Sequence, residues 1–309
     1  MTKRLRVVLL VLVATAMLAA AAVGVAPAAG GRPAYPVPYN FGAGLLAAAT
    51  QPGSSPPGSN DWDCTPTEAH PSPVVLVHGT FANMTVSWQA LAPLLANHGY
   101  CVFALDYGGE AGRQTQATGD IPTSAGQLAA FVDEVLGATG APKVDIVGHS
   151  QGGMMPRWYI KFLGGDATVR ALVGLSPSNH GTTLFGLATL ADALPGGAAA
   201  FAGFCPACSQ QLAGSEFLAT LHAGGDTVPG PVYTVIQTRY DEVVTPYHSS
   251  FLTGPEVTNI TLQDRCALDL GDHLAVIYDR VALHHVLNAL DPARATRPPC
   301  TVVLPGVGG

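Results

Sequence analysis

The chain has 309 residues, 48% of them apolar, and a formal net charge of −7 at pH 7. This length and apolar content are enough for one sizeable hydrophobic core, and they exclude a chain too small or too polar to fold alone. The acidic balance argues against nucleic acid or an anionic membrane surface as a partner.

The first 29 residues have the pattern of a secretory signal peptide. Lys3, Arg4 and Arg6 precede an uncharged run over residues 7–25, which ends in the small-residue segment 26–29. This order predicts cleavage, secretion to the extracellular space and no stable membrane anchor afterwards. An uncleaved anchor is the alternative, because the run is long enough to span a bilayer. Cleavage removes three of the 14 basic residues and no acid, so the mature chain has 11 basic against 21 acidic residues, or about −10.

Residues 30–71 are rich in Pro, Gly, Ser and Ala, which predicts an irregular segment lying over the fold. Beyond it, short apolar runs alternate with stretches of helical periodicity. The predicted strands are residues 74–77, 101–105, 144–147, 169–175, 232–237 and 257–261, and the predicted helices are 87–98, 124–139, 153–163 and 274–290. This alternation predicts an α/β fold with a mainly parallel, twisted sheet that helices cover on both faces.

A candidate nucleophile lies between a predicted strand and a predicted helix. Residues 148–152 read Gly-His-Ser-Gln-Gly, a G-x-S-x-G match centred on Ser150. The strand, sharp turn and helix around it are the context of a nucleophile elbow. Gly148 and Gly152 supply the small residues that such a turn needs on either side of the serine. The sequence therefore predicts Ser150 as a catalytic nucleophile.

A serine nucleophile needs a base, and the base needs an orienting acid; in this kind of fold the order along the chain is Ser, acid, His. Asp241 follows the strand 232–237, where that acid is expected, and His273 lies between the last strand and the helix 274–290. We therefore predict Asp241 and His273 as the other two members of a catalytic triad. The remaining candidates are predicted to be solvated loop charges or packed helix residues: Asp226, Glu242, Asp264, Asp269, Asp272, His284 and His285.

Two backbone amides are predicted to form the oxyanion hole. Gln151 follows the nucleophile directly, and Thr80 lies in the loop after the strand 74–77. The Thr80 hydroxyl could add a third bond, and Phe81 is the alternative to Thr80. His78 and His149 are interpreted as structural supports of these two turns.

Residues 184–217 are predicted to form a cap or lid insertion, because apolar residues recur there at helical spacing before a Gly-rich and Ala-rich stretch. A mobile lid that presents an apolar face to lipid and a packed cap that never moves both remain open.

Six cysteines in an exported chain indicate three disulfides, although six allow fifteen pairings. The preferred pairs are Cys64 with Cys101, Cys205 with Cys208, and Cys266 with Cys300. No ligand spacing indicates a zinc site of the finger type.

Several of these motifs together carry a resemblance to a known family. The residues V-V-L-V-H-G-T, G-H-S-Q-G-G and S-P-S-N-H-G-T, with the late Asp and His, resemble the secreted bacterial class 2 triacylglycerol lipases of the α/β-hydrolase superfamily. The H-G-T and S-Q-G-G pair is also similar to the fungal lipase B type, in which a Thr and a Gln form the oxyanion hole. The resemblance implies an α/β-hydrolase fold over residues 72–309, ester hydrolysis through an acyl-enzyme on Ser150, and no organic cofactor. A structural Ca²⁺, which some bacterial lipase groups bind, is left open, and no metal ligand is assigned.

The predicted function is that of a secreted lipase or carboxylic-ester hydrolase, acting as a monomer on a lipid or ester substrate, with a lipid–water interface as one setting. A short-chain esterase, a polyester depolymerase and an acyltransferase are the alternatives within this fold. A non-catalytic binding module is the alternative from another class.

Overall fold

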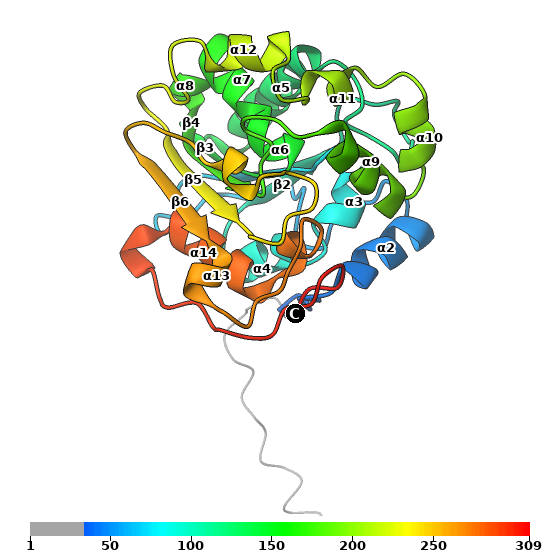
Figure 1. The fold of residues 1–309 in the computed structure, drawn as a ribbon. Helices are drawn as coiled ribbons and strands as arrows, with labels where there is room; N and C mark the ends of the chain where they lie inside the picture. Colours follow the sequence, from blue (N-terminus) through cyan, green and yellow to red (C-terminus); the bar gives the residue numbers. More distant parts are fainter. Residues whose placement is uncertain (1–33) are drawn as a thin grey trace, which may run out of the picture. The chain divides into compact units, whose positions relative to one another are not determined.

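The computed structural model describes residues 34–309, so the predicted signal peptide lies outside the described residues. Six parallel strands form one sheet in the order β2-β1-β3-β4-β5-β6. The strands are β1 (Val74–Val77), β2 (Val102–Leu105), β3 (Val144–His149), β4 (Val169–Leu175), β5 (Val232–Gln237) and β6 (Val257–Thr261). This topology, with helices between the strands, confirms the predicted α/β-hydrolase architecture (Figure 1).

Helices connect the strands and cover the sheet (Figure 1). They are α2 (Phe41–Thr50), α3 (Met84–Ser87), α4 (Leu91–Asn97), α5 (Ile121–Thr139), α6 (Gln151–Met154), α7 (Pro156–Phe162), α8 (Gly165–Thr168), α9 (Leu184–Ala193), α10 (Gly197–Ala202), α11 (Pro206–Gln210), α12 (Glu216–His222), α13 (Leu262–Arg265) and α14 (Arg280–Leu290). Short 3₁₀ helices lie at η2 (Tyr247–Ser250), η3 (Ala275–Tyr278) and η4 (Pro292–Arg294).

Strand β1 is buried on both faces, which explains its uninterrupted apolar sequence. In β1, Val74 and Leu76 belong to a core cluster that includes residues of α4 and α14. Val75 and Val77 belong to a second cluster on the other face, with residues of α5 and α7. Because successive side chains of a strand point to opposite faces, one short apolar run serves both cores.

The prediction that residues 30–71 are irregular was wrong for part of that segment. Helix α2 forms there, with the Asn40 side chain accepting a hydrogen bond from the amide of Gly42 at its start. Phe41 packs edge-on against Tyr278, and a Cβ at Gly44 would lie only 2.2 Å from the Tyr278 hydroxyl oxygen. The helix therefore docks through glycine and alanine, which leave no strong apolar period in the sequence.

Two predicted helices are each divided in the structure. The helix predicted over residues 153–163 already begins at Gln151, and Pro156 starts a second helix, α7. The helix predicted over 274–290 consists of η3 followed by α14, because the Asp279 side chain accepts a hydrogen bond from the Val281 amide and caps a new helix start.

Three disulfides are present, and they join the pairs preferred from the sequence: Cys64–Cys101, Cys205–Cys208 and Cys266–Cys300. Within residues 34–309, none of the helices combines the length and apolarity needed to cross a bilayer.

Candidate active site

Ser150 lies in a sharp turn between β3 and α6. Its backbone has φ 55° and ψ −123°, a conformation that a residue with a side chain adopts only at a cost of about 1–3 kcal/mol. A Cβ at Gly148 would lie 1.8 Å from the Gly152 carbonyl oxygen, and one at Gly152 would lie 2.1 Å from the Val77 carbonyl oxygen. Both positions therefore require glycine, as the G-x-S-x-G pattern predicts. The strained turn is held in place by the surrounding backbone, and the amide of Ser150 donates to the Leu175 carbonyl over 3.0 Å.

Asp241 and His273 form a buried hydrogen-bonded pair. Asp241 follows β5, and its Oδ2 accepts a hydrogen bond of 2.9 Å from Nδ1 of His273. Its other oxygen, Oδ1, accepts from the amides of Val243 and Val244 at 2.9 and 2.7 Å. Gln237 Nε2 donates to Oδ2 over 2.9 Å. The carboxylate is thus fixed on all sides, and it in turn fixes the orientation of the imidazole.

The electrostatics of the pair suit a base and its orienting acid. Burial alone would raise the pKa of Asp241, but the His273 imidazole and the hydrogen bonds to the carboxylate outweigh burial and hold that pKa below its ordinary value. Burial would lower the pKa of His273, whereas Asp241 beside it raises the pKa above the ordinary histidine value. Asp241 therefore stays ionised, and His273 is a stronger base than burial alone would leave it.

His149 ties this pair to the nucleophile turn. Its Nε2 donates to the His273 backbone carbonyl over 2.9 Å, and the two rings lie 4.7 Å apart between centroids. Burial lowers the pKa of His149 to about 3, so its ring stays neutral. Because His149 directly precedes Ser150 in the chain, this bond links the Asp241–His273 pair to the nucleophile turn. The Nε2 atom of His273 is buried and makes no hydrogen bond to the described residues, which leaves it available to a substrate or a hydroxyl.

The predicted oxyanion residues meet in a buried polar network that also includes the cap. The hydroxyl of Thr80 donates to Oε1 of Gln151 over 2.7 Å. Gln211, a residue of the cap segment, donates through Nε2 to the same Thr80 oxygen at 2.9 Å and to Gln151 Oε1 at 3.1 Å. Its Oε1 accepts from the Ser178 hydroxyl at 3.0 Å. Gln211 thus contacts both predicted oxyanion residues, although no local sequence pattern marks it for this role.

Of the two candidates for the second oxyanion amide, only Thr80 has a free N–H. The amide of Phe81 donates to the Gln116 carbonyl over 3.0 Å, so this N–H is not available to an oxyanion. The amide of Thr80 makes no hydrogen bond to the described part of the chain. This favours Thr80 over Phe81 as the partner of the Gln151 amide.

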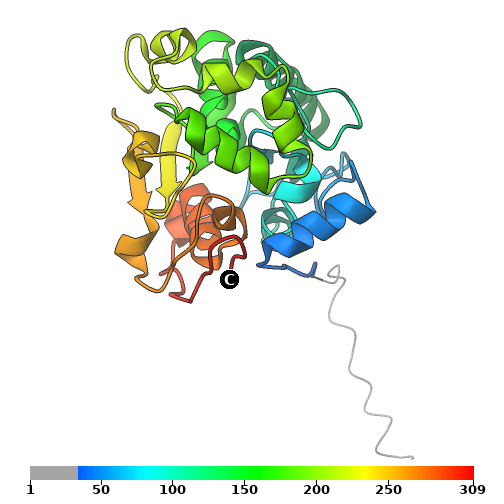
Figure 2. The ribbon, with the colours of Figure 1, turned by 45° about the vertical axis from the view of Figure 1, so that its right-hand side comes forward.

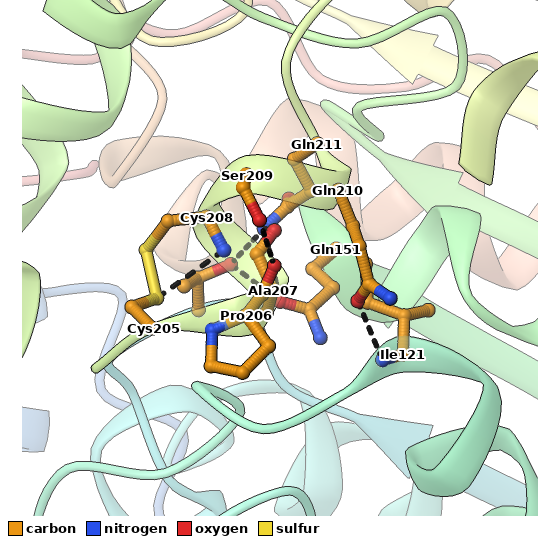
Figure 3. Close-up of a disulfide and its surroundings, with 10 residues drawn as sticks. Ile121, Gln151, Cys205, Pro206, Ala207, Cys208, Ser209, Gln210 and Gln211 are labelled. Carbon is orange, nitrogen blue, oxygen red and sulfur yellow. Dashed lines mark hydrogen bonds between the residues drawn. A yellow bond between two sulfur atoms is a disulfide. The ribbon is translucent and has the colours of Figure 1, made fainter. Parts of the chain in front are cut away.

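Figure 3 shows the local structure that presents Gln211 to this network. Cys205 and Cys208 close the first turn of α11, and Gln211 follows the last residue of that helix. Its neighbour Gln210 points the other way, where its Oε1 accepts from the Ile121 amide at the start of α5. The Cys205–Cys208 bridge therefore lies in a segment that anchors the cap to the sheet, as a structural role implies.

Three acids predicted to be solvated are not. Glu242 is half-buried and accepts a hydrogen bond of 3.3 Å from the amide of His273. Asp269 is fully buried near Asp279, and Asp226 is 8% exposed and pairs with Arg157 and His180. Each of these partners lies far from its acid in the sequence, so no local pattern marked the acids as buried.

The predicted cap segment is helical and covers the site in this structure. It forms α9, α10 and α11 and reaches into the start of α12; Figure 2 brings these helices to the front. Leu187, Ala191 and Leu194 are buried, as the predicted helical face requires, whereas Leu184 and Phe185 are 62% and 80% exposed. The three residues predicted as a triad, Ser150, Asp241 and His273, are at most 5% exposed.

Comparison with known proteins places the chain in a family. A sequence profile of the family described as Lipase (class 2) matches residues 71–284, which is more than half of the chain. A triacylglycerol lipase of Pseudarthrobacter phenanthrenivorans and one of Burkholderia plantarii are each 40% identical over 92 residues. That segment is 28% of this chain and only 27% and 24% of those relatives.

Solved structures share the fold at low identity. Aspergillus fumigatus lipase B is 21% identical with a TM-score of 0.58, over 80% of this chain and 56% of that one. The mature form of Bacillus licheniformis lipase BlEst2 is 19% identical with a TM-score of 0.55, over 73% of this chain and 94% of that one. From the match of the family profile, the chain belongs to the class 2 lipases.

Proposed function

We propose that the mature chain is a secreted lipase or carboxylic-ester hydrolase that cleaves acylglycerol esters through an acyl-enzyme on Ser150. Membership of the class 2 lipases supports this activity, as does the name triacylglycerol lipase of two relatives. The observation that carries the proposal is the strained turn at Ser150 together with the buried Asp241–His273 pair, which is bonded to His149, the residue before Ser150.

In the first half of the reaction, the Ser150 hydroxyl oxygen attacks the ester carbonyl carbon while Nε2 of His273 takes the hydroxyl proton. The carbonyl oxygen becomes an oxyanion, to which the amides of Thr80 and Gln151 donate hydrogen bonds. The tetrahedral intermediate then collapses, the carbon–oxygen bond to the alcohol breaks, and His273 returns the proton to the leaving alkoxide. The products are an acyl-serine and a free alcohol.

In the second half, water attacks the acyl carbon and gives its proton to His273. Collapse of the second intermediate breaks the bond to Ser150, and the serine oxygen takes the proton back. The fatty or short-chain acid leaves, and the resting enzyme is restored. Since each step uses only water and groups of the chain, we expect no organic cofactor.

Asp241 acts through His273 in both halves. Its lowered pKa keeps it negative at neutral pH, so it stabilises the imidazolium that forms when Nε2 is protonated. The hydrogen bond from Nδ1 also fixes the tautomer, because Nδ1 carries the proton and Nε2 presents its lone pair.

The surface of the cap favours a lipid substrate. Leu184, Phe185 and Phe204 are 62%, 80% and 91% exposed, and all three lie in the segment that covers the buried triad. Large apolar side chains in water are costly unless another apolar surface contacts them. We therefore propose that this surface contacts the lipid–water interface.

The direct test replaces the nucleophile. Purified mature protein should hydrolyse p-nitrophenyl esters and emulsified triglycerides, and Ser150→Ala should lower kcat by about 10⁴-fold or more with the fold retained. An ester-hydrolysing preparation that keeps its rate after this change contradicts the assignment of Ser150. A folded protein with no hydrolysis of any ester would instead favour a binding module.

A rate series over acyl length separates the enzymatic alternatives. The proposal predicts faster turnover of emulsified long-chain glycerides than of soluble acetates. The opposite ranking would identify a short-chain esterase. Release of soluble acids from a polyester film would identify a depolymerase, and formation of ester products with added alcohol would identify an acyltransferase.

A further inference from the structure

Two histidines and an aspartate meet where the cap leaves the sheet and where it returns. His180 lies in the loop after β4, His222 is the last residue of α12, and Asp226 lies in the loop before β5 (Figure 1). One candidate ligand atom from each side chain lies within 4.8 Å of the other two. The two imidazole rings are 4.4 Å apart between centroids. Helices α9, α10 and α11, with nearly all of α12, lie between the two histidines in the chain.

The hydrogen bonds of His180 leave two acceptor atoms facing each other, Nε2 of His180 and Oδ1 of Asp226, and this arrangement needs a positive charge between them. Nδ1 of His180 is 2.9 Å from the Ser249 carbonyl oxygen, which can only accept, so Nδ1 carries the proton. In the neutral ring, Nε2 then presents a lone pair. It faces Oδ1 of Asp226 at 3.1 Å, and two acceptors at this distance repel each other. Either a second proton on His180 or a metal ion removes this repulsion.

The other two side chains are arranged in the same way. Nε2 of His222 is 2.8 Å from the Asn179 carbonyl oxygen, so Nε2 carries the proton and Nδ1 has the lone pair. Oδ2 of Asp226 accepts from the amide and the hydroxyl of Thr253 at 2.9 and 2.8 Å, which leaves Oδ1 for another partner. Metal-binding histidines and carboxylates in proteins typically have such outer hydrogen bonds, which fix the tautomer and the orientation of each ligand.

We propose that His180, His222 and Asp226 bind a Zn²⁺ ion that joins the two ends of the cap to each other. Two imidazoles and one carboxylate suit zinc, whereas Ca²⁺ prefers a set of oxygen ligands. Bonds of about 2.0–2.1 Å at the tetrahedral angle place neighbouring ligands about 3.3 Å apart. The His180–Asp226 pair is already at that spacing, and the partly exposed His180 ring leaves room for a water as the fourth ligand.

Arg157 opposes a second cation at this position. Its Nη2 is 3.4 Å from Oδ1 of Asp226, but its shorter bonds, of 3.2 and 3.1 Å, go to the backbone carbonyl of Asp226. The guanidinium therefore mainly positions the Asp226 backbone. Its charge lowers the affinity for zinc, and a proton on His180 is the competing occupant.

The test measures zinc binding by the whole mature protein and does not depend on ester hydrolysis. After treatment with EDTA and its removal at pH 7.5, titration with ZnCl₂ in a calorimeter should give one site per chain. The melting temperature should rise with added zinc. Both effects should be lost at pH 5, because the proton then displaces the metal from the imidazoles. Absence of binding by the wild-type protein at pH 7.5 overturns the proposal.

Matched variants locate the site. His180→Gln and His222→Gln should weaken zinc binding by more than about 100-fold, since loss of an outer partner alone costs about 10–100-fold. His98→Ala removes an exposed histidine outside the cluster and should bind zinc like the wild type. If a variant fails to fold, cobalt added to the wild-type protein gives a separate readout, because tetrahedral nitrogen and oxygen ligands produce strong visible absorption. Equal binding by all variants, or no visible band with cobalt, refutes the assignment to these residues.

Discussion

Replacing Gln211 with leucine tests whether the cap positions the oxyanion residues. Leucine has nearly the same volume, so the change removes polar contacts and little packing. Gln211 is 1% exposed, and its two shortest side-chain bonds, to Thr80 Oγ1 at 2.9 Å and from the Ser178 hydroxyl at 3.0 Å, are lost. At about 1–2 kcal/mol for each, including the groups left unpaired, the free energy of unfolding should fall by about 2–4 kcal/mol.

The effect on catalysis follows from the same contacts. Thr80 keeps its bond to Gln151 but loses the donor that holds its oxygen in place. Removal of a whole oxyanion donor costs about 10²–10³ in kcat, and loosening one should cost about 10-fold with KM nearly unchanged. Gln211→Glu should be worse, because a carboxylate would face the oxygen atoms of Thr80 and Gln151 and repel the developing oxyanion.

Gln210→Leu is the matched control, since within residues 34–309 the Gln210 side chain bonds to Asp120 and to the Ile121 amide at the start of α5, and not to Thr80 or Gln151. It should lower stability by about 1–2 kcal/mol and leave kcat unchanged. Urea unfolding and steady-state kinetics with a soluble p-nitrophenyl ester measure both quantities. Equal kcat values for the two leucine variants would refute a positioning role of Gln211.

Three further predictions follow from other parts of the structure. Gly152→Ala should destabilise the protein by more than about 3 kcal/mol, because the added Cβ would meet backbone oxygens. Gly126→Ala, in the open middle of α5, should instead stabilise it by up to about 1 kcal/mol. Chemical unfolding of both variants gives the comparison, and equal effects would contradict the steric argument. Activity should fall as pH drops through the raised pKa of His273, with a midpoint above the ordinary value of about 6.5. Asp241→Asn should lower kcat by about 10⁴-fold and move the midpoint down, since burial is then opposed by Glu242 and Asp272 without the larger contribution of Asp241; a profile that stays flat to pH 4 argues against His273 as the base. Burial and the neighbouring Asp269 raise the pKa of Asp279 well above its ordinary value, so the wild type should lose stability as pH rises from about 4 through that raised pKa. The stability of Asp279→Asn should depend less on pH. Urea unfolding at pH 5 and pH 8 tests this, and equal pH dependence of both proteins would exclude the buried pair as its cause.

The sequence was most informative where a single local pattern determines the structure. Strands β1, β4, β5 and β6 have the predicted bounds. In β1 the reason is that a strand buried on both faces must be apolar throughout. The turn at Ser150 was recognisable because its glycines are required by backbone contacts at 1.8 and 2.1 Å. Asp241 and His273 were predicted as a pair because sites of this fold lie at the carboxyl ends of strands, and the structure brings them within hydrogen-bond distance.

Features that depend on contacts between distant segments were not predictable in this way. Gln211 is one of two adjacent glutamines, and only the packing of α11 decides which of them meets Thr80. Likewise, no local pattern distinguishes Glu242 from a solvated charge, because its contact with the His273 amide joins two loops that are separate in the sequence. The zinc ligands proposed above come from two segments, because His180 is separated from His222 and Asp226 by the whole cap, so the three residues form no local metal motif in the sequence.

The contacts of the cap also decide which of its parts can open. Its second half is tied down: the Ala207 amide donates to the Thr118 carbonyl, Gln211 enters the oxyanion network, and Lys161 Nζ donates to the carbonyls of Leu221, Ala223 and Gly225. The first half, α9 and α10, contributes the exposed Leu184 and Phe185, and Thr115 is bonded to the Pro195 carbonyl between these helices. Movement of α11 would break the bonds of Gln211 to Thr80 and Gln151, whereas α9 and α10 make no hydrogen bond to these two residues in the described part of the chain and reach this region through the ring contact of Phe201 with Phe81. We therefore expect access to Ser150 to open by displacement of α9 and α10 at a lipid surface, with α11 remaining in place to hold Thr80 and Gln151.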